Sequence, residues 1–183
     1  MNLFQESISK IEKEYNSNSN ELEWRFLTTS KQRLIDNNGI FLITLNPGGK
    51  YAPDDHSTAS CENGCAYLVE RWGNKTEPGT STLQKQFQLL FKEIAKRLKI
   101  KNYVEVLESS LCGYFIPFRS PSFDDLKDKN RSIDFSMRLW KNILQNTEFK
   151  VLICIDKKTY KYLHKILVDI SYRKISEIEL ETG

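Results

Sequence analysis

The chain has 183 residues, a length that suits one domain with its own hydrophobic core, without disulfide or metal staples. Apolar residues make up 39% and aromatic residues 11% of the chain, so the composition does not support disorder. No run approaches the roughly 18 uncharged apolar residues of a membrane span. The net charge of +3 permits contact with a polyanion but is too small for a protein that coats nucleic acid.

The amino-terminal segment MNLFQESISKIEKEY does not fit a secretory signal, because charges interrupt its apolar positions and no small-residue cleavage site follows. A cytoplasmic protein is therefore expected, and no membrane partner. Apolar periodicity predicts helices over residues 3–15 and 21–35, separated by the polar loop NSNSN. Because no internal repeat or linker divides the sequence, residues 1–183 are expected to form a single domain.

The run IFLITL at residues 40–45 predicts a buried strand, because it is almost entirely apolar and is bounded by turn residues on both sides. It stops at Asn46-Pro47-Gly48-Gly49. From there to about residue 79 the chain is rich in Gly, Pro, Asp and Ser, which predicts a long irregular loop. Loops of this length usually carry function.

A helix is predicted next, because Ser81 and Gln84 form a capping-box pattern ahead of an apolar face. That face consists of Leu83, Phe87, Leu90, Phe91, Ile94 and Leu98. Residues 103–107 predict a second strand, and residues 111–118 an extended apolar segment interrupted by Gly113.

The remaining elements alternate between helix and strand. Residues 135–145 and 157–168 predict helices, and residues 151–155 and 175–180 predict strands. This alternation is typical of an α/β fold with a mainly parallel central sheet between two layers of helices, a three-layer α/β/α sandwich. The basic clusters 96–101 and 157–161 are typical of solvated surface near helix ends.

No metal ion or other cofactor is expected. The CxxxC spacing of Cys61 and Cys65 would suit a metal ion or a disulfide. However, Cys112 and Cys154 fall in apolar runs that predict buried strands, where a cysteine acts as a small hydrophobe. The cytosol also keeps most thiols reduced, so free cysteines are the expectation.

His56 follows Asp54 and Asp55 in the long loop. It could act as an acid or base if the loop folds over a pocket, but a histidine on the loop surface is the expectation. The two adjacent carboxylates lack a third spaced ligand and so predict no cation site.

The turn Asn46-Pro47-Gly48-Gly49 lies where α/β folds bind their ligands, directly beyond the carboxyl end of a strand. Glycines let a backbone approach a ligand closely, successive amide N–H groups can hold an anion, and Asn46 offers both a donor and an acceptor. An ordinary turn is the alternative interpretation, because Asn-Pro-Gly is a common turn sequence.

Two segments resemble a known family. Leu45-Asn46-Pro47-Gly48 is similar to the first motif of the mismatch-specific and single-strand-selective branches of the uracil-DNA glycosylase superfamily, in which a strand is followed by Asn-Pro-Gly. The segment LCGYFIPFRS at residues 111–120 resembles the middle strand of that superfamily and the loop that lines its base pocket. Together with the order of elements, the resemblance covers residues 25–170 in approximate terms.

The resemblance implies hydrolysis of an N-glycosidic bond in DNA, with a uracil or another damaged base rotated out of the stack into a pocket. In these branches the asparagine positions the attacking water, which implies that Asn46 is the catalytic residue. The backbone of Pro47, Gly48 and Gly49 would then shape the pocket.

An aromatic ring stacks on the flipped base in this family, and Tyr51 or Tyr67 would supply it, with Trp72 a weaker candidate. Each of these rings also fits a role in the core or in anchoring the loop. Tyr114 stands where related glycosylases often carry an asparagine that reads the uracil edge, and Phe115 follows it in the pocket strand.

Arg119 and Ser120 would bind a phosphate at the mouth of the pocket. An arginine after a strand fits a second role equally well, an ion pair with Asp124 or Asp125. The sequence leaves both roles open.

The second motif of the superfamily, a histidine with a Pro-Ser-like turn after the last strand, has no counterpart here, because no histidine follows His164. A longer protein cut before that motif and a chain without it would look alike. Two functions therefore stay open: a glycosylase-like hydrolase, and a catalytically inactive module that binds nucleotide or DNA. In either case the expected partner is single- or double-stranded DNA or a nucleotide, and a monomer is expected.

Overall fold

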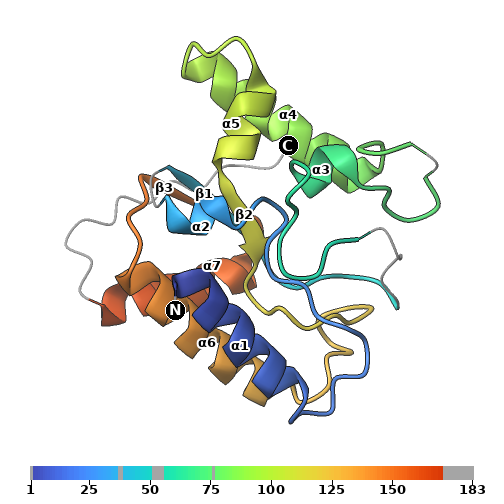
Figure 1. Ribbon diagram of the computed structural model, residues 1–183, viewed down its shortest axis with the longest axis vertical. Coiled ribbons are helices and arrows are strands. Elements are labelled where there is room, and N and C mark those ends of the chain that lie inside the picture. The colour runs from blue at the N-terminus through green and yellow to red at the C-terminus, as the bar shows by residue number, and fades with distance from the viewer. Residues whose placement is uncertain (1, 37–38, 51–55, 76, 171–183) are drawn as a thin grey trace.

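The structure is a computed structural model that describes residues 2–36, 39–50, 56–75 and 77–170. Within these residues, three parallel strands form one sheet in the order β2-β1-β3 (Figure 1). The strands are β1 (Ile40–Thr44), β2 (Leu111–Tyr114) and β3 (Val151–Cys154). The chain is therefore an α/β protein with a parallel sheet, which confirms the predicted class.

The central strand β1 is buried on both faces. Phe41, Leu42 and Ile43 are 1%, 0% and 0% exposed. Because successive side chains of a strand point to opposite faces, Phe41 and Ile43 join one hydrophobic core and Leu42 joins the other. Burial on both sides explains why this strand is a continuous apolar run rather than an alternating one.

One face of the sheet is covered by three long helices, which lie in the lower half of Figure 1. They are α1 (Leu3–Tyr15), α6 (Lys129–Gln145) and α7 (Lys157–Asp169). Trp140 of α6 is fully buried in this core, and its indole nitrogen donates a hydrogen bond of 2.9 Å to the carbonyl oxygen of Phe115. This bond fixes the segment that follows β2 against α6.

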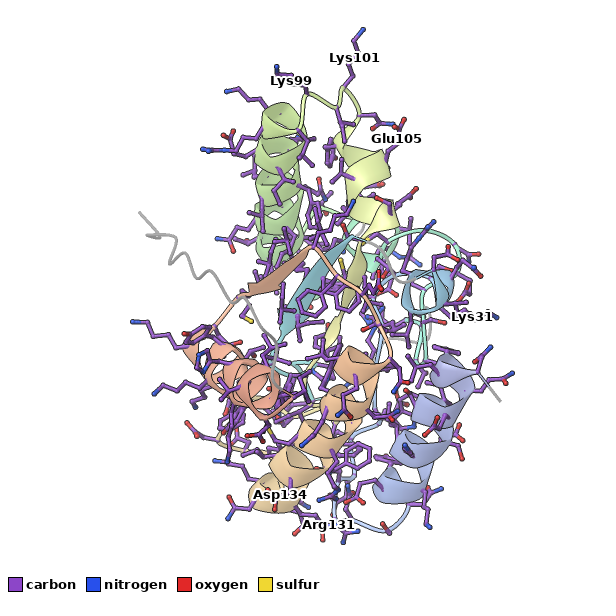
Figure 2. The ribbon with its side chains drawn as sticks, turned by 90° about the vertical axis from the view of Figure 1, so that its left-hand side faces the viewer. Lys31, Lys99, Lys101, Glu105, Arg131 and Asp134 are labelled. Atoms are coloured by element: carbon purple, nitrogen blue, oxygen red, sulfur yellow. The ribbon has the colours of Figure 1, made fainter. Side chains whose placement is uncertain are left out.

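The opposite face is covered by a second group of helices, in the upper half of Figure 1. They are α3 (Ala66–Val69), α4 (Thr82–Arg97) and α5 (Tyr103–Ser109). Phe87 and Phe91 of α4 point into this second core. Figure 2 shows Lys99 and Lys101 between α4 and α5, pointing away from the protein as expected for solvated surface.

In the order β2-β1-β3 the first strand is central. The chain therefore passes from β1 to the strand on one side, β2, and then crosses β1 to reach the strand on its other side, β3. The connection from β1 to β2 runs through α3, α4 and α5 on one face, and the connection from β2 to β3 runs through α6 on the other. After β3 the chain enters α7, on the same face as α6. The segments that follow β1 and β3 thus diverge to opposite faces, which creates a crevice at this switch point.

Several predicted elements are confirmed. Helix α1 matches residues 3–15, and α4 begins at the predicted capping box, in which the Ser81 hydroxyl accepts from the Gln84 backbone and the Gln84 side chain accepts from the Ser81 backbone. Strands β1 and β3 and helix α7 also lie where they were predicted, and α6 contains residues 135–145 but begins earlier, at Lys129. The predicted strand over residues 175–180 lies outside the described residues.

The helix predicted over residues 21–35 is wrong for most of its length. Only α2 (Gln32–Ile35) is helical, and the preceding segment runs antiparallel to β2 and its continuation through bridges of Trp24 with Phe118 and Leu27 with Gly113. The backbone N–H of Thr28, for example, donates to the Cys112 carbonyl at 2.8 Å. Hydrogen bonds to the edge of β2 therefore outweigh the local helical periodicity.

The strand predicted over residues 103–107 is also wrong, because these residues form α5. Asn102 caps this helix by accepting a hydrogen bond from the Val104 N–H at 3.1 Å. Val106 and Leu107 are buried in the core beneath α4. Tertiary packing thus overrides the strand preference of a short run of aromatic and β-branched residues.

None of the helices formed by the described residues combines the length and the apolar character that crossing a bilayer would need.

Gly113 is the position in β2 where a side chain would cost most. A Cβ there would lie 2.9 Å from the Phe26 carbonyl oxygen and 3.1 Å from the Leu27 side chain. We expect Gly113→Ala to lower the free energy of unfolding by about 1–3 kcal/mol in urea titration. Gly48→Ala is the control, because a Cβ at Gly48 meets nothing within 4 Å; equal losses in both variants would contradict the assignment of this contact.

Candidate ligand site at the carboxyl ends of the strands

The turn after β1 is held by the loop after β2. The Asn46 side chain donates from Nδ2 to the Ser120 hydroxyl at 2.9 Å and to the Pro47 carbonyl at 3.2 Å. The backbone N–H of Ser120 donates to the same Pro47 carbonyl at 3.1 Å. The structure thus brings together Asn46, Pro47 and Ser120, which the sequence places far apart.

These contacts fix which way the Asn46 amide points. The Ser120 hydroxyl donates its only hydrogen to the Ser122 carbonyl at 2.6 Å, so toward Asn46 it can only accept. Nδ2 must therefore face Ser120, and Oδ1 faces away from it. No hydrogen bond from the described residues occupies Oδ1, and the half-buried Asn46 thus presents a free acceptor at the carboxyl edge of the sheet.

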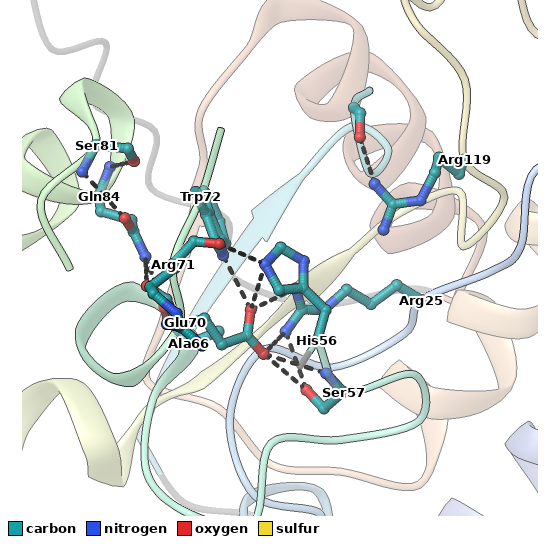
Figure 3. A network of polar contacts seen from close by, with 11 residues as sticks. Arg25, His56, Ser57, Ala66, Glu70, Arg71, Trp72, Ser81, Gln84 and Arg119 are labelled. Carbon is teal, nitrogen blue, oxygen red and sulfur yellow. Dashed lines mark hydrogen bonds and ion pairs between the residues drawn. The ribbon is translucent and has the colours of Figure 1, made fainter. Parts of the chain in front are cut away.

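Gly48 and Gly49 form the exposed part of this turn. Gly49 has a φ of +92°, a conformation that residues with a side chain rarely adopt, so the turn requires glycine at this position. The carbonyl oxygen of Gly48 accepts a hydrogen bond from Arg119 Nη1 at 2.5 Å (Figure 3). Arg119 thus holds the far end of the turn while Ser120 holds its start.

Arg119 is only 7% exposed. The side chain makes no ion pair with any described carboxylate, and its Nε has no hydrogen-bond partner there. Burial lowers the pKa of this guanidinium from its ordinary value, an effect that the nearby Tyr114 opposes. The alternative pairing with Asp124 or Asp125 is not observed, because Asp124 pairs with Lys129 at 3.1 Å and Asp125 accepts from Ser122 at 2.7 Å.

A buried ion pair lies beside Arg119 (Figure 3). Arg25 and Glu70 are 2% and 4% exposed, and the two guanidinium nitrogens Nη1 and Nη2 donate to the two carboxylate oxygens at 2.8 and 2.5 Å. Trp72 Nε1 donates to Glu70 at 2.9 Å, and the Ser57 hydroxyl lies 3.0 Å from both Glu70 and Arg25. The pair joins the edge segment of β2 to the long loop.

The pKa of Glu70 follows from these contacts. Burial alone would raise it, but the hydrogen bonds and the charge of Arg25 outweigh burial, and the pKa lies below its ordinary value of 4.5. Glu70 therefore stays ionised and serves as the countercharge of Arg25. It is a poor candidate for a general base, because both of its oxygens are already occupied.

His56 is not on the loop surface, where it was expected. Its side chain is 8% exposed, and Nε2 lies 2.8 Å from the carbonyl oxygen of Arg71 and 3.9 Å from Glu70. A carbonyl oxygen can only accept, so Nε2 carries the hydrogen and donates it to Arg71. This contact makes His56 a part of the Glu70 network rather than a free base.

The described aromatic candidates are too deeply buried to stack on a base that enters from solvent. Tyr67 in α3 is 1% exposed and stacks on Phe87 with ring centroids 4.2 Å apart, and burial raises the pKa of its hydroxyl well above the ordinary value. Phe115 is fully buried and stacks on Tyr162 at 5.2 Å. Both rings therefore belong to the cores. Tyr51 lies outside the described residues.

Of the described aromatic candidates, Tyr114 has the surroundings most typical of a binding site. It ends β2 and is 8% exposed. Burial raises the pKa of its hydroxyl, while the charges of Arg25 and Arg119 act in the opposite direction. The phenol therefore lies within the electrostatic reach of both arginines.

A wide, shallow cavity of about 520 Å³ lies at the same edge, in the crevice between the ends of β1 and β3. It has an apolar part and a charged rim. The lining residues are Thr44, Leu45, Leu83, Phe87, Ile155, Asp156, Lys157 and Lys158. Thr44 and Leu45 lead directly into Asn46, so the cavity and the turn share the end of one strand.

Most of these lining residues are not predicted as site residues by the sequence. It favours solvated surface for Lys157 and Lys158, assigns Ile155 only to a buried strand, and gives Asp156 no role. The signal that could have found them is their position directly after a buried strand, on the opposite side of β1 from β2. Phe87 was assigned to the core face of its helix, and it lies both in that core and at the cavity wall.

Among the described residues, no group of histidine, cysteine, aspartate and glutamate side chains could hold a metal ion. The four cysteines are free thiols. Comparison with protein-family models, with curated proteins and with solved structures finds no match for this chain. The fold and the site therefore define the protein as an α/β protein with a candidate ligand site at its switch point.

The buried pair gives a test of the site's framework. We expect Glu70→Gln to lower the free energy of unfolding by about 3–5 kcal/mol, because Arg25 then remains buried without a countercharge. Because the folded pKa of Glu70 is depressed, its contribution is fully present above the ordinary pKa of 4.5 and is lost as the pH falls through the folded value. Urea titrations from pH 7 to pH 3 should show this acid-side loss in the wild type and not in the variant.

Glu93→Gln is the matched control, because Glu93 pairs with Arg97 on the surface, where the two side chains are 51% and 78% exposed. We expect it to change stability by less than about 1 kcal/mol. A cost for Glu70→Gln as small as that of the control would show that the buried pair does not hold the loop.

Proposed function

We propose that this protein hydrolyses the N-glycosidic bond of a uracil or another damaged base in DNA, with the attacking water held by Asn46. The observation that carries the proposal is the fixed orientation of the Asn46 amide. Ser120 and Pro47 occupy Nδ2 and leave Oδ1 as a free acceptor at the carboxyl edge of the sheet. A water molecule needs an acceptor of this kind to be oriented toward a sugar carbon.

The chemistry of an amide suits this reaction. Asn46 cannot take up a proton strongly, so it cannot create a hydroxide ion. If the bond to the base breaks first, the sugar becomes an oxocarbenium-like cation that a neutral water can attack. The protein then mainly has to position the water, and an amide held by two hydrogen bonds needs little reorganisation to do so.

The cavity supports a substrate of base and sugar size. Its volume of about 520 Å³ is large enough for a base and its sugar, although its open shape would leave part of such a ligand exposed to solvent. Leu45 and Phe87 offer an apolar wall for a base that has left the stack. Lys157 and Lys158 on the rim favour a polyanion such as DNA. The proposed hydrolysis uses water and needs no cofactor.

A binding module without catalytic activity is the second candidate function, and the environment of Asn46 favours it. No described histidine or carboxylate forms a hydrogen bond with the Asn46 side chain. His56 and Glu70 are occupied with Arg71 and Arg25. A site without an acid to protonate the departing base would bind a nucleotide or DNA and release nothing.

Base release from uracil-containing single- and double-stranded oligonucleotides tests the hydrolase. We expect Asn46→Ala to reduce release by a factor of about 10²–10³ with little change in DNA affinity, because the water loses its acceptor in the transition state. The matched control is Asn146→Ala at the exposed end of α6, which should release base at the wild-type rate. Release that is absent in the wild type, or equal in Asn46→Ala, would contradict the proposal.

Ser120 acts as a positioning residue in this proposal. Ser120→Ala should reduce the rate constant of release about tenfold at unchanged KM, because the amide loses the contact that orients it. Ser120→Thr keeps the hydroxyl and should restore most of the rate. Equal rates in the alanine and threonine variants would show that the hydroxyl does not orient Asn46.

A further inference from the structure

Arg119 carries a buried charge that forms no direct ion pair with any described carboxylate. Its guanidinium has five N–H donors, and Nη1 uses one of them on the Gly48 carbonyl. Nε has no hydrogen-bond partner among the described residues, although only 7% of Arg119 is exposed to solvent. A neutral carbonyl satisfies a donor but does not balance a positive charge.

The charged groups near Arg119 do not neutralise it. Glu70 accepts hydrogen bonds from both terminal guanidinium nitrogens of Arg25 and from Trp72, so its charge is already balanced. Arg25 is itself a cation, and it disfavours the charged form of Arg119. The backbone carbonyl of Glu23 accepts a hydrogen bond from the backbone N–H of Arg119 at 3.1 Å. The charges of Glu23 and Glu70 favour the charged form of Arg119, but burial outweighs them and its pKa lies below the ordinary value. An uncompensated buried charge is costly, and an anion from outside would relieve that cost.

The surroundings of Arg119 suit an anion with several oxygens. The backbone N–H groups of the exposed Gly48 and Gly49 donate to no acceptor in the described part of the chain. They belong to the same turn whose carbonyl Arg119 holds. Exposed glycine amides next to a guanidinium are a common arrangement for binding phosphate oxygens.

We propose that Arg119 and the amides of Gly48 and Gly49 form a subsite for one phosphate group, adjacent to Asn46. The ligand chemistry is a phosphate ester of a nucleoside, either the terminal phosphate of a nucleotide or a diester of a DNA backbone. The subsite stands on the charge and geometry of Arg119 and does not depend on hydrolysis. It also restricts where a nucleotide can sit, because its phosphate would lie beside Asn46.

Isothermal titration calorimetry with defined probes tests the subsite without any turnover. The probes are 2′-deoxyuridine, its 5′-monophosphate, the diester dinucleotide dTpdT and inorganic phosphate. We expect at least one phosphate ester to bind about tenfold or more tightly than the nucleoside, and Arg119→Met to abolish this preference. The matched control Arg97→Met removes a surface arginine of α4 and should keep the preference.

The two ester probes distinguish the source of the phosphate. Preference for the monophosphate indicates a nucleotide terminus, and preference for the dinucleotide indicates a DNA backbone. A nucleoside that binds as tightly as both esters, or a preference that survives in Arg119→Met, would overturn the proposal.

A second measurement covers the case in which Arg119→Met does not fold. Phosphate should raise the Tm of the wild type above the value in chloride at equal ionic strength, because the anion relieves the buried charge. Arg119→Lys keeps the charge but loses the planar fork, so it should show a smaller rise. No difference between phosphate and chloride in the wild type would overturn the proposal. Phosphate binding without base release would sink the hydrolase and leave the subsite intact.

Discussion

The ion pair between Arg25 and Glu70 joins two irregular segments on which the candidate site depends. Arg25 belongs to the extended segment beside β2, and Glu70 ends the short helix α3 in the long loop. The backbone carbonyl of Glu70 also accepts a hydrogen bond of 2.8 Å from Gln84, which is part of the capping box of α4. The side chain and the backbone of Glu70 together thus link the edge of the sheet, the loop and the helix behind it. Removing the negative charge would leave Arg25 and Arg119 as neighbouring buried cations.

The site itself is assembled by parallel topology. Because β1, β2 and β3 run in the same direction, their carboxyl ends meet at one edge, and the segments that follow them converge there. The turn after β1 is bonded to Ser120 and Arg119 from the segment after β2, and the cavity lies toward β3. A rigid sheet that is buried on both faces can hold these short segments in fixed positions. The free acceptor of Asn46 and the unpaired charge of Arg119 are properties of that assembly, not of either motif alone.

The sequence predicts the elements with strong local signals and fails where distant contacts decide. The apolar run of β1 and the capping box at Ser81 are local features, and both predictions are confirmed. The helix predicted over residues 21–35 is wrong because these residues pair with β2, and a non-local interaction of this kind leaves no trace in helical periodicity. At the site, the position of Asn46 after a strand was predictable, but its contact with Ser120 and the burial of His56 and Arg119 depend on how the loops pack.

Binding of a nucleotide at the carboxyl edge of the sheet can be measured by a ¹H–¹⁵N NMR titration of the assigned protein with 2′-deoxyuridine 5′-monophosphate. We expect saturable shift changes in the backbone amides of residues 46, 48–50, 119, 120 and 122, with further changes at Phe87 and residues 155–158 around the cavity. Changes confined to other surfaces, or no saturable change at millimolar ligand, would contradict binding at this edge.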